Sequence, residues 1–80
     1  MRNYTQQLGG FILECYGSGI AYALIHCATN SQVWLQGDDA TQFESDWESI
    51  EATFPHFTRE QVARYLWDQY EYCVAAIELS

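Results

Sequence analysis

The chain has 80 residues and a formal net charge of −8, with eleven carboxylates, three arginines and no lysine. This acidity argues against direct binding to nucleic acid or to an anionic membrane, because both carry the same sign of charge. The chain is also 49% hydrophobic and 16% aromatic, a composition that disordered acidic tails lack. We therefore expect one folded domain over residues 1–80.

Three apolar segments in the first half predict neighbouring β-strands. The first covers residues 11–16 and is followed by Gly17-Ser18-Gly19, whose glycines suit a tight turn. The second covers residues 20–27, although its alanines leave a helix over residues 20–28 as an alternative. After a polar turn, residues 32–36 form the third strand. Connections this short join antiparallel neighbours.

The second half predicts two helices, of which the first carries apolar residues at helical spacing up to Phe54. Asp38 or Asp39 can cap its beginning, and Pro55 ends it. Thr58 and Gln61 have the spacing of a capping box at the start of the second helix.

The second helix is expected to run to about Ile77. Its predicted core face consists of Val62, Leu66, Tyr70, Cys73 and Ile77. A three-stranded sheet has one face to bury, and two amphipathic helices can cover it. The sequence therefore predicts an α+β fold with a three-stranded antiparallel sheet covered by two C-terminal helices, in the order β-β-β-α-α.

Six carboxylates lie on or just before the first predicted helix: Asp38, Asp39, Glu44, Asp46, Glu48 and Glu51. At ~100° per residue, Glu44, Glu48 and Glu51 fall on one flank of that helix. Asp46 falls on the other flank. A solvated helix face usually mixes charges, because Glu–Lys pairs at i,i+4 stabilise a helix by ~0.2–0.5 kcal/mol and like pairs cost about as much.

No cation lies near these acids in the sequence. A row of carboxylates can satisfy the Lys and Arg side chains with which a protein otherwise holds successive phosphates. We therefore predict that these six residues bind a basic protein partner. The alternative is a solvated surface helix.

The remaining chemistry of the chain predicts no catalytic residues, no metal and no cofactor. Cys15, Cys27 and Cys73 lack the paired spacing of a structural zinc site, and we expect all three to be reduced and buried. Trp67 and Tyr72 flank the apolar face of the last helix. They are either the edge of the core or aromatic anchors for a protein partner.

The polar N-terminus predicts no signal peptide, and no apolar segment reaches the ~20 residues that span a bilayer. Together with the odd number of cysteines, this pattern predicts a cytoplasmic protein.

The size, the strong negative charge, the lack of a catalytic motif and the α+β layout resemble the small phage-encoded inhibitors of bacterial defence, in particular anti-CRISPR proteins that act as acidic DNA mimics. The resemblance implies a protein that binds the DNA-binding surface of a CRISPR effector complex in the bacterial cytoplasm and prevents target DNA from binding there. The alternative function is a small regulatory or assembly module of a bacterial protein complex, held by the aromatic flank of the last helix. The sequence leaves open whether the protein is a monomer or a dimer.

Overall fold

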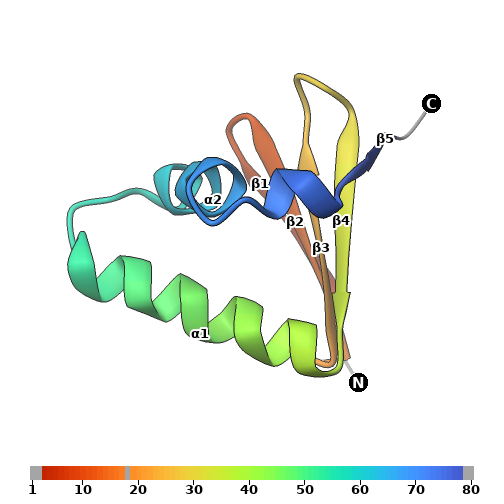
Figure 1. Ribbon diagram of the computed structural model, residues 1–80, viewed down its shortest axis with the longest axis horizontal. Coiled ribbons are helices and arrows are strands. Elements are labelled where there is room, and N and C mark those ends of the chain that lie inside the picture. The colour runs from red at the N-terminus through yellow and green to blue at the C-terminus, as the bar shows by residue number, and fades with distance from the viewer. Residues whose placement is uncertain (1–2, 18, 79–80) are drawn as a thin grey trace.

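The computed structural model describes residues 3–17 and 19–78, in which a strand meander is followed by two helices. The elements in chain order are β1 (Tyr4–Leu8), β2 (Phe11–Tyr16), β3 (Ala21–His26), β4 (Ser31–Gln36), α1 (Asp38–Thr53), α2 (Arg59–Asp68), the 3₁₀-helix η1 (Tyr72–Ala75) and β5 (Ile77–Glu78). The sheet has the strand order β1-β2-β3-β4-β5, and every neighbouring pair is antiparallel (Figure 1).

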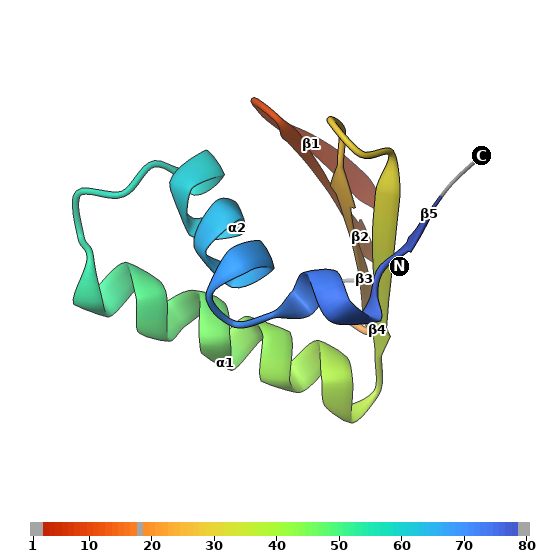
Figure 2. The same cartoon turned by 45° about the horizontal axis from the view of Figure 1, so that its top comes forward.

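Both α-helices and η1 lie on one side of the sheet, as the two views in Figures 1 and 2 show. The predicted α+β class, the antiparallel sheet and the two helices after it are confirmed. None of the helices in the described part of the chain is long and apolar enough to cross a bilayer.

The prediction of only three strands is wrong, because β1 precedes them and the short β5 follows the helices. β1 has the sequence Tyr-Thr-Gln-Gln-Leu, which lacks the apolar alternation that marks a strand. Its pairing with β2 supplies the missing stabilisation, in a register that runs from Tyr4 opposite Cys15 to Leu8 opposite Phe11. The two-residue turn between them contains Gly9 at a φ of +63°, a conformation that glycine adopts readily.

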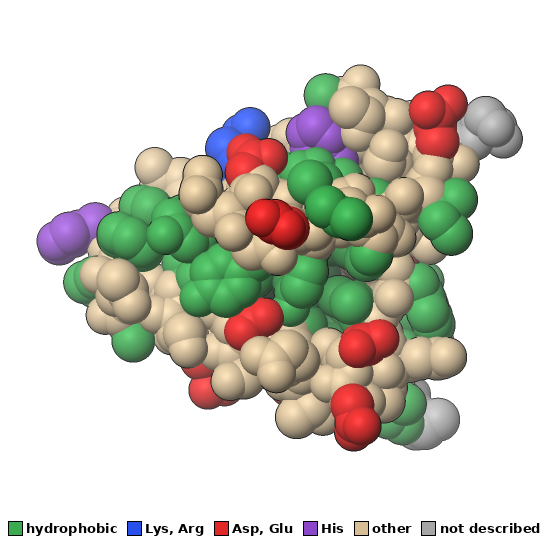
Figure 3. Space-filling view, viewed as in Figure 1, with side chains coloured by type: hydrophobic (Ala, Val, Ile, Leu, Met, Phe, Trp, Pro, Cys, Tyr) green, Lys and Arg blue, Asp and Glu red, His purple; other side chains and the backbone are tan. Residues whose placement is uncertain are grey.

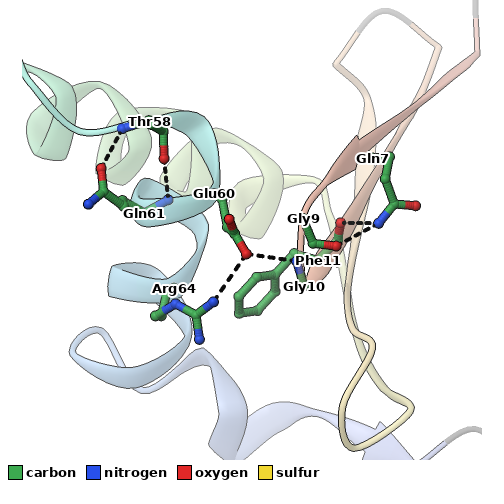
Figure 4. A network of polar contacts seen from close by, with 8 residues as sticks. All are labelled: Gln7, Gly9, Gly10, Phe11, Thr58, Glu60, Gln61 and Arg64. Carbon is green, nitrogen blue, oxygen red and sulfur yellow. Dashed lines mark hydrogen bonds and ion pairs between the residues drawn. The ribbon is translucent and has the colours of Figure 1, made fainter.

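A carboxylate from α2 holds this turn in place (Figure 4). Glu60 Oε2 accepts a hydrogen bond of 2.8 Å from the Gly10 backbone N–H and forms an ion pair of 3.2 Å with Arg64 Nη2. A Cβ atom at Gly9 would collide with the same carboxylate. The first hairpin and α2 are therefore fixed to each other across 50 residues of sequence.

The starts of the two helices differ from each other in their capping. Gly37 is the N-cap of α1 and offers no side chain, so the prediction that Asp38 or Asp39 caps this helix is wrong. Both aspartates lie within its first turn, where the helix dipole still favours negative charge. The capping box of α2 is confirmed: Gln61 N–H donates to Thr58 Oγ1 at 3.2 Å, and Thr58 N–H donates to Gln61 Oε1 at 2.7 Å (Figure 4).

α2 ends at Asp68 rather than near Ile77. Glu71 adopts a left-handed conformation with a φ of +61°, which turns the chain away from the axis of α2. This turn lets η1 place the Tyr72 ring on Phe43, with ring centroids 5.8 Å apart, and lets β5 pair with β4. Tertiary packing thus overrides an apolar pattern that by itself would continue the helix.

Several side chains consequently lie elsewhere than their spacing predicts. Of the predicted core face of the last helix, Val62 and Leu66 are buried, whereas Tyr70, Cys73 and Ile77 are exposed. The expectation that all three cysteines are buried holds for Cys15 and is wrong for Cys73 and for Cys27, which follows the end of β3.

The hydrophobic core lies between the helices and the face of the sheet that they cover. The strands contribute Leu8, Phe11, Leu13, Cys15, Tyr22, Leu24, Val33 and Leu35, and the helices contribute Ala40, Phe43, Trp47, Ile50, Val62, Ala63, Leu66 and Trp67. Trp67 is only 5% exposed. The centroid of its ring lies 5.2 Å from that of the His26 ring and 5.9 Å from that of the Phe11 ring. Trp67 is therefore a core residue in this fold.

Replacing Trp67 with Ala is expected to lower the free energy of unfolding by ~3–5 kcal/mol, because the substitution removes a buried ring and leaves a cavity. Tyr70→Ala is a suitable control: this side chain is 40% exposed, and its loss should cost less than ~1 kcal/mol. Urea unfolding followed by circular dichroism measures both values. Equal, small losses in the two variants would contradict the core position of Trp67.

Candidate partner-binding surface

Glu44, Glu48 and Glu51 lie on the flank of α1 that faces the β1 side of the sheet, where they line an open groove of about 230 Å³. The residues that line this groove, called the acidic groove below, are Tyr4, Leu13, Tyr22, Phe43, Glu44, Trp47, Glu48, Glu51 and Arg59. Strands, α1 and the first turn of α2 all contribute to it. The structure thus brings together the three glutamates that helical spacing placed on one flank.

The base of the acidic groove is aromatic. Phe43 lies at its centre, with its ring 5.0 Å from Tyr22 and 5.9 Å from Trp47, and all three side chains are largely buried. Burial first, and then hydrogen bonding to the Glu44 carboxylate, raise the pKa of Tyr22 well above its ordinary value. At neutral pH the Tyr22 hydroxyl is protonated, as an ordinary tyrosine is, and donates toward Glu44.

Arg59 lies at the edge of the groove without forming an ion pair. Its guanidinium lies 5.1 Å from the centre of the Trp47 ring, and its Nε donates to Gln6 Oε1 at 3.0 Å. Among the described residues, the ion pair within 4.0 Å is the one between Glu60 and Arg64. Among the described residues, the three exposed glutamates of the groove thus form no ion pair within 4.0 Å, although the Arg59 guanidinium lines the same groove.

Asp46 lies apart from the groove, as its predicted place on the opposite flank requires. Its carboxylate accepts hydrogen bonds from the Tyr72 hydroxyl at 2.6 Å and from Gln42 Nε2 at 2.8 Å. Burial of the Tyr72 hydroxyl is the larger cause that raises its pKa above the ordinary value, and the hydrogen bond from this hydroxyl to Asp46 is the next. Asp46 and Tyr72 therefore fix η1 to α1, and their polar groups are engaged within the molecule.

The six predicted acidic residues accordingly form no single row. Three line the groove, Asp46 contacts η1, and Asp38 and Asp39 are exposed at the N-terminal end of α1. Figure 3 shows the same pattern on the face in view, where acidic side chains form separate patches among hydrophobic and uncharged ones. Of the two predicted aromatic anchors, Trp67 is buried in the core and Tyr72 is half-buried against Phe43.

Sequence reasoning missed Tyr4, Tyr22 and Arg59 as neighbours of the glutamates. Tyr4 belongs to the unpredicted strand β1, and Arg59 reaches the groove only through the turn between the helices. Alternation along the strands was the available signal for Tyr22, which shares a sheet face with Leu24.

The groove offers little room for a small-molecule substrate, because its volume of about 230 Å³ falls below the ~300–1,000 Å³ of typical ligand pockets. Within residues 3–17 and 19–78, no three His, Cys, Asp or Glu side chains group as the ligands of a metal ion would. Comparison with known protein families, curated proteins and solved structures finds no match to this chain.

The Asp46–Tyr72 contact predicts a specific pH dependence of stability. Folded Tyr72 keeps its proton at pH values where an unfolded tyrosine, with a pKa of ~10, has lost it. The free energy of unfolding should therefore fall as the pH rises above ~10 and continue to fall until the raised pKa is passed. Tyr72→Phe removes this contribution, so its stability should fall less steeply between pH ~9 and ~11.5.

Urea unfolding at several pH values in that range measures the two slopes. Tyr70→Phe is the matched control, because the Tyr70 hydroxyl forms no hydrogen bond with the described residues and its ring is exposed. The wild-type slope should persist in this variant. Identical slopes for wild type and Tyr72→Phe would contradict the assigned contact.

Proposed function

We propose that this protein is a non-enzymatic inhibitor that binds the basic nucleic-acid-binding surface of a bacterial protein complex and blocks it by acidic mimicry. The observation that supports the proposal is the acidic groove, in which Glu44, Glu48 and Glu51 surround an aromatic base without a neutralising ion pair among the described residues. The resemblance to small phage-encoded inhibitors makes a CRISPR effector complex the specific candidate partner.

The groove has the chemistry that an arginine or lysine side chain requires. A guanidinium can stack on an aromatic face and pair with a carboxylate at the same time, and the contact is strongest where water is excluded. Phe43 and Trp47 lie beneath the exposed carboxylates and are only 2% and 8% exposed, so a partner's cation would meet mainly the carboxylates. The Arg59 guanidinium already lies 5.1 Å from the centre of the Trp47 ring, so an incoming cation would share this ring with Arg59 or displace it.

The spacing of the carboxylates also fits a phosphate-binding surface. Residues three or four apart on a helix are separated by ~4.5–6 Å along its axis. The phosphates of one DNA strand advance by ~3.4 Å per nucleotide along the duplex axis. The glutamate spacing lies between the ~3.4 Å of neighbouring and the ~6.8 Å of alternate phosphates, a difference that the long side chains of Lys and Arg can bridge.

The overall charge supports the same partner class. A net charge of −8 on so small a chain creates a field that attracts a basic surface and repels nucleic acid. By contrast, the burial of Trp67 removes the main support for an assembly module anchored by aromatic residues of the last helix.

The direct experiment combines capture with competition. The tagged protein is incubated with a lysate of CRISPR-bearing bacteria, and the captured complex is identified by mass spectrometry. Binding of target DNA by that purified complex is then measured against rising concentrations of the protein. Wild type should displace the DNA, and the Glu44→Gln/Glu48→Gln/Glu51→Gln variant should be weaker by ~10-fold or more, because it removes the charge of the groove.

The matched control carries the same change in net charge at exposed positions outside the groove. This control is Asp68→Asn/Glu71→Gln/Glu78→Gln, and it should inhibit nearly as well as wild type. Equal loss in both triple variants would assign the effect to net charge alone. Inhibition that survives the loss of the three groove carboxylates would contradict the proposal.

Salt provides a further prediction. Raising NaCl from ~50 to ~500 mM shortens the screening length from above ~10 Å to below ~5 Å, which weakens attraction between opposite charges. The dissociation constant for the captured complex should rise by ~10-fold or more, mainly through slower association. Biolayer interferometry at four salt concentrations measures both rate constants, and salt-independent association would contradict electrostatic docking.

A further inference from the structure

The sheet has a second face, which no described element covers. Figures 1 and 2 show both helices and η1 on the same side, so the other side stays open. Alternation along the paired strands places the following residues on this outer face: Thr5, Gln7, Ile12, Glu14, Tyr16, Ala21, Ala23, Ile25, Gln32, Trp34, Gln36 and Ile77. Most of them are apolar, whereas an antiparallel sheet that faces water usually carries polar residues there.

The outer face is organised around an aromatic pair. The ring centroids of Tyr16 on β2 and Trp34 on β4 lie 5.1 Å apart, across the intervening strand β3. They can meet there because the intervening strand presents the small residues Ala21 and Ala23, which are 5% and 0% exposed beneath them. Trp34 nevertheless keeps 45% of its surface exposed, so the pair forms a raised apolar centre.

Aliphatic side chains continue this surface along one row of the sheet. Ile12 pairs with Ile25, which pairs with Gln32, and Gln32 pairs with Ile77. Ile77 is 72% exposed. Ile12 and Ile25 are partly exposed, and Gln32 separates Ile25 from Ile77, so the apolar surface centres on the Tyr16–Trp34 pair. An exposed apolar patch of this kind marks an interaction site in soluble proteins.

The charge distribution indicates which occupant fits. Of the eleven carboxylates in the chain, the outer face carries Glu14, whose Oε1 accepts a hydrogen bond of 2.9 Å from the Tyr16 hydroxyl. The other carboxylates belong to the helices, to the segment after α2 and to the edge strand β5. The outer face is thus the side of the molecule on which two copies of this acidic chain repel each other least.

If the outer faces of two copies pack together, the helices that carry most of the carboxylates lie on the far sides of the two sheets. Packed sheets lie ~10 Å apart, and the helices of each copy lie beyond its own sheet. The two acidic grooves would therefore point in opposite directions, at a separation well above the ~8 Å screening length at physiological salt.

The area is sufficient for a weak dimer. β1 has five residues and β2, β3 and β4 have six each. At a strand spacing of ~4.8 Å and ~3.3 Å per residue, these four strands cover ~360 Å² before the relief of the side chains is included. Two such faces bury on the order of 1,000 Å², which is near the lower bound for a specific interface.

We propose that a second copy of this chain covers the outer face, so that the protein forms an isologous, sheet-on-sheet dimer. Trp34 is its central contact and Ile77 lies at its edge. Glu14 limits the affinity, because both copies bring this carboxylate toward the interface and neither brings a described cation to it. This inference does not rest on the proposed function, because it uses none of the residues of the acidic groove.

Sedimentation equilibrium of the full chain over ~1–300 μM tests the dimer. We expect reversible dimerisation that strengthens as salt rises, since salt screens the repulsion between two copies. Trp34→Gln and Ile77→Gln should each weaken it, by ~10-fold for the tryptophan. Glu14→Gln should strengthen it, because the amide still accepts from the Tyr16 hydroxyl and carries no charge.

Val74→Gln is the matched control, since this residue is 78% exposed and belongs to η1 on the helical side of the sheet (Figure 2). It should dimerise as wild type does, and so should the groove variant Glu44→Gln/Glu48→Gln/Glu51→Gln. Circular dichroism verifies that each variant is folded. A wild type that stays monomeric throughout the range overturns the proposal, as does a dimer that both Trp34→Gln and Ile77→Gln leave intact.

Discussion

Two helices pack against a single face of the sheet, and the core of this small protein lies between them. Phe43, Leu66 and Leu24 meet there, and each is at most 2% exposed. A short chain buries only ~60–65% of the surface that its unfolded form exposes, so one well-filled layer must supply most of the stability. The aromatic residues of the helices are therefore used in the core, and the carboxylates of α1 are left on its flanks.

This arrangement produces three surfaces of different character. One flank of α1 carries glutamates above an aromatic base, the other flank is occupied by η1, and the uncovered face of the sheet is apolar. The first surface suits a cationic partner, because its carboxylates have no ion pair among the described residues. The uncovered face of the sheet suits an apolar partner surface. Glu14 is thus the one carboxylate of the described residues on the uncovered face, and the other ten lie elsewhere.

Local sequence signals predicted the elements that local interactions determine. The capping box at Thr58 depends on residues within one turn, and the apolar stripe of α1 depends on spacing alone. β1 could not be recognised in this way, because its polar residues acquire a strand conformation only by pairing with β2. The two-residue Gly9-Gly10 turn was the one local signal for it.

Long-range contacts decide the remaining features. α2 stops at Asp68 because η1 and β5 pack against α1 and β4, which no local pattern shows. The grouping of Glu44, Glu48 and Glu51 followed from helical spacing, whereas the aromatic base beneath them and the approach of Arg59 required the tertiary fold. The chemistry of the candidate site was therefore predictable in its charge but not in its shape.

In the proposed function, the carboxylates of the acidic groove contact the cations of a nucleic-acid-binding surface. Carbodiimide cross-linking of the protein to its captured partner, followed by peptide mass spectrometry, tests this contact most directly, since it joins carboxylates to lysines that lie against each other. Cross-links from Glu44, Glu48 or Glu51 to lysines that DNA protects from modification are the predicted result. Cross-links confined to Glu14, Asp68 or Glu78, or to lysines outside the DNA-binding surface, would contradict it.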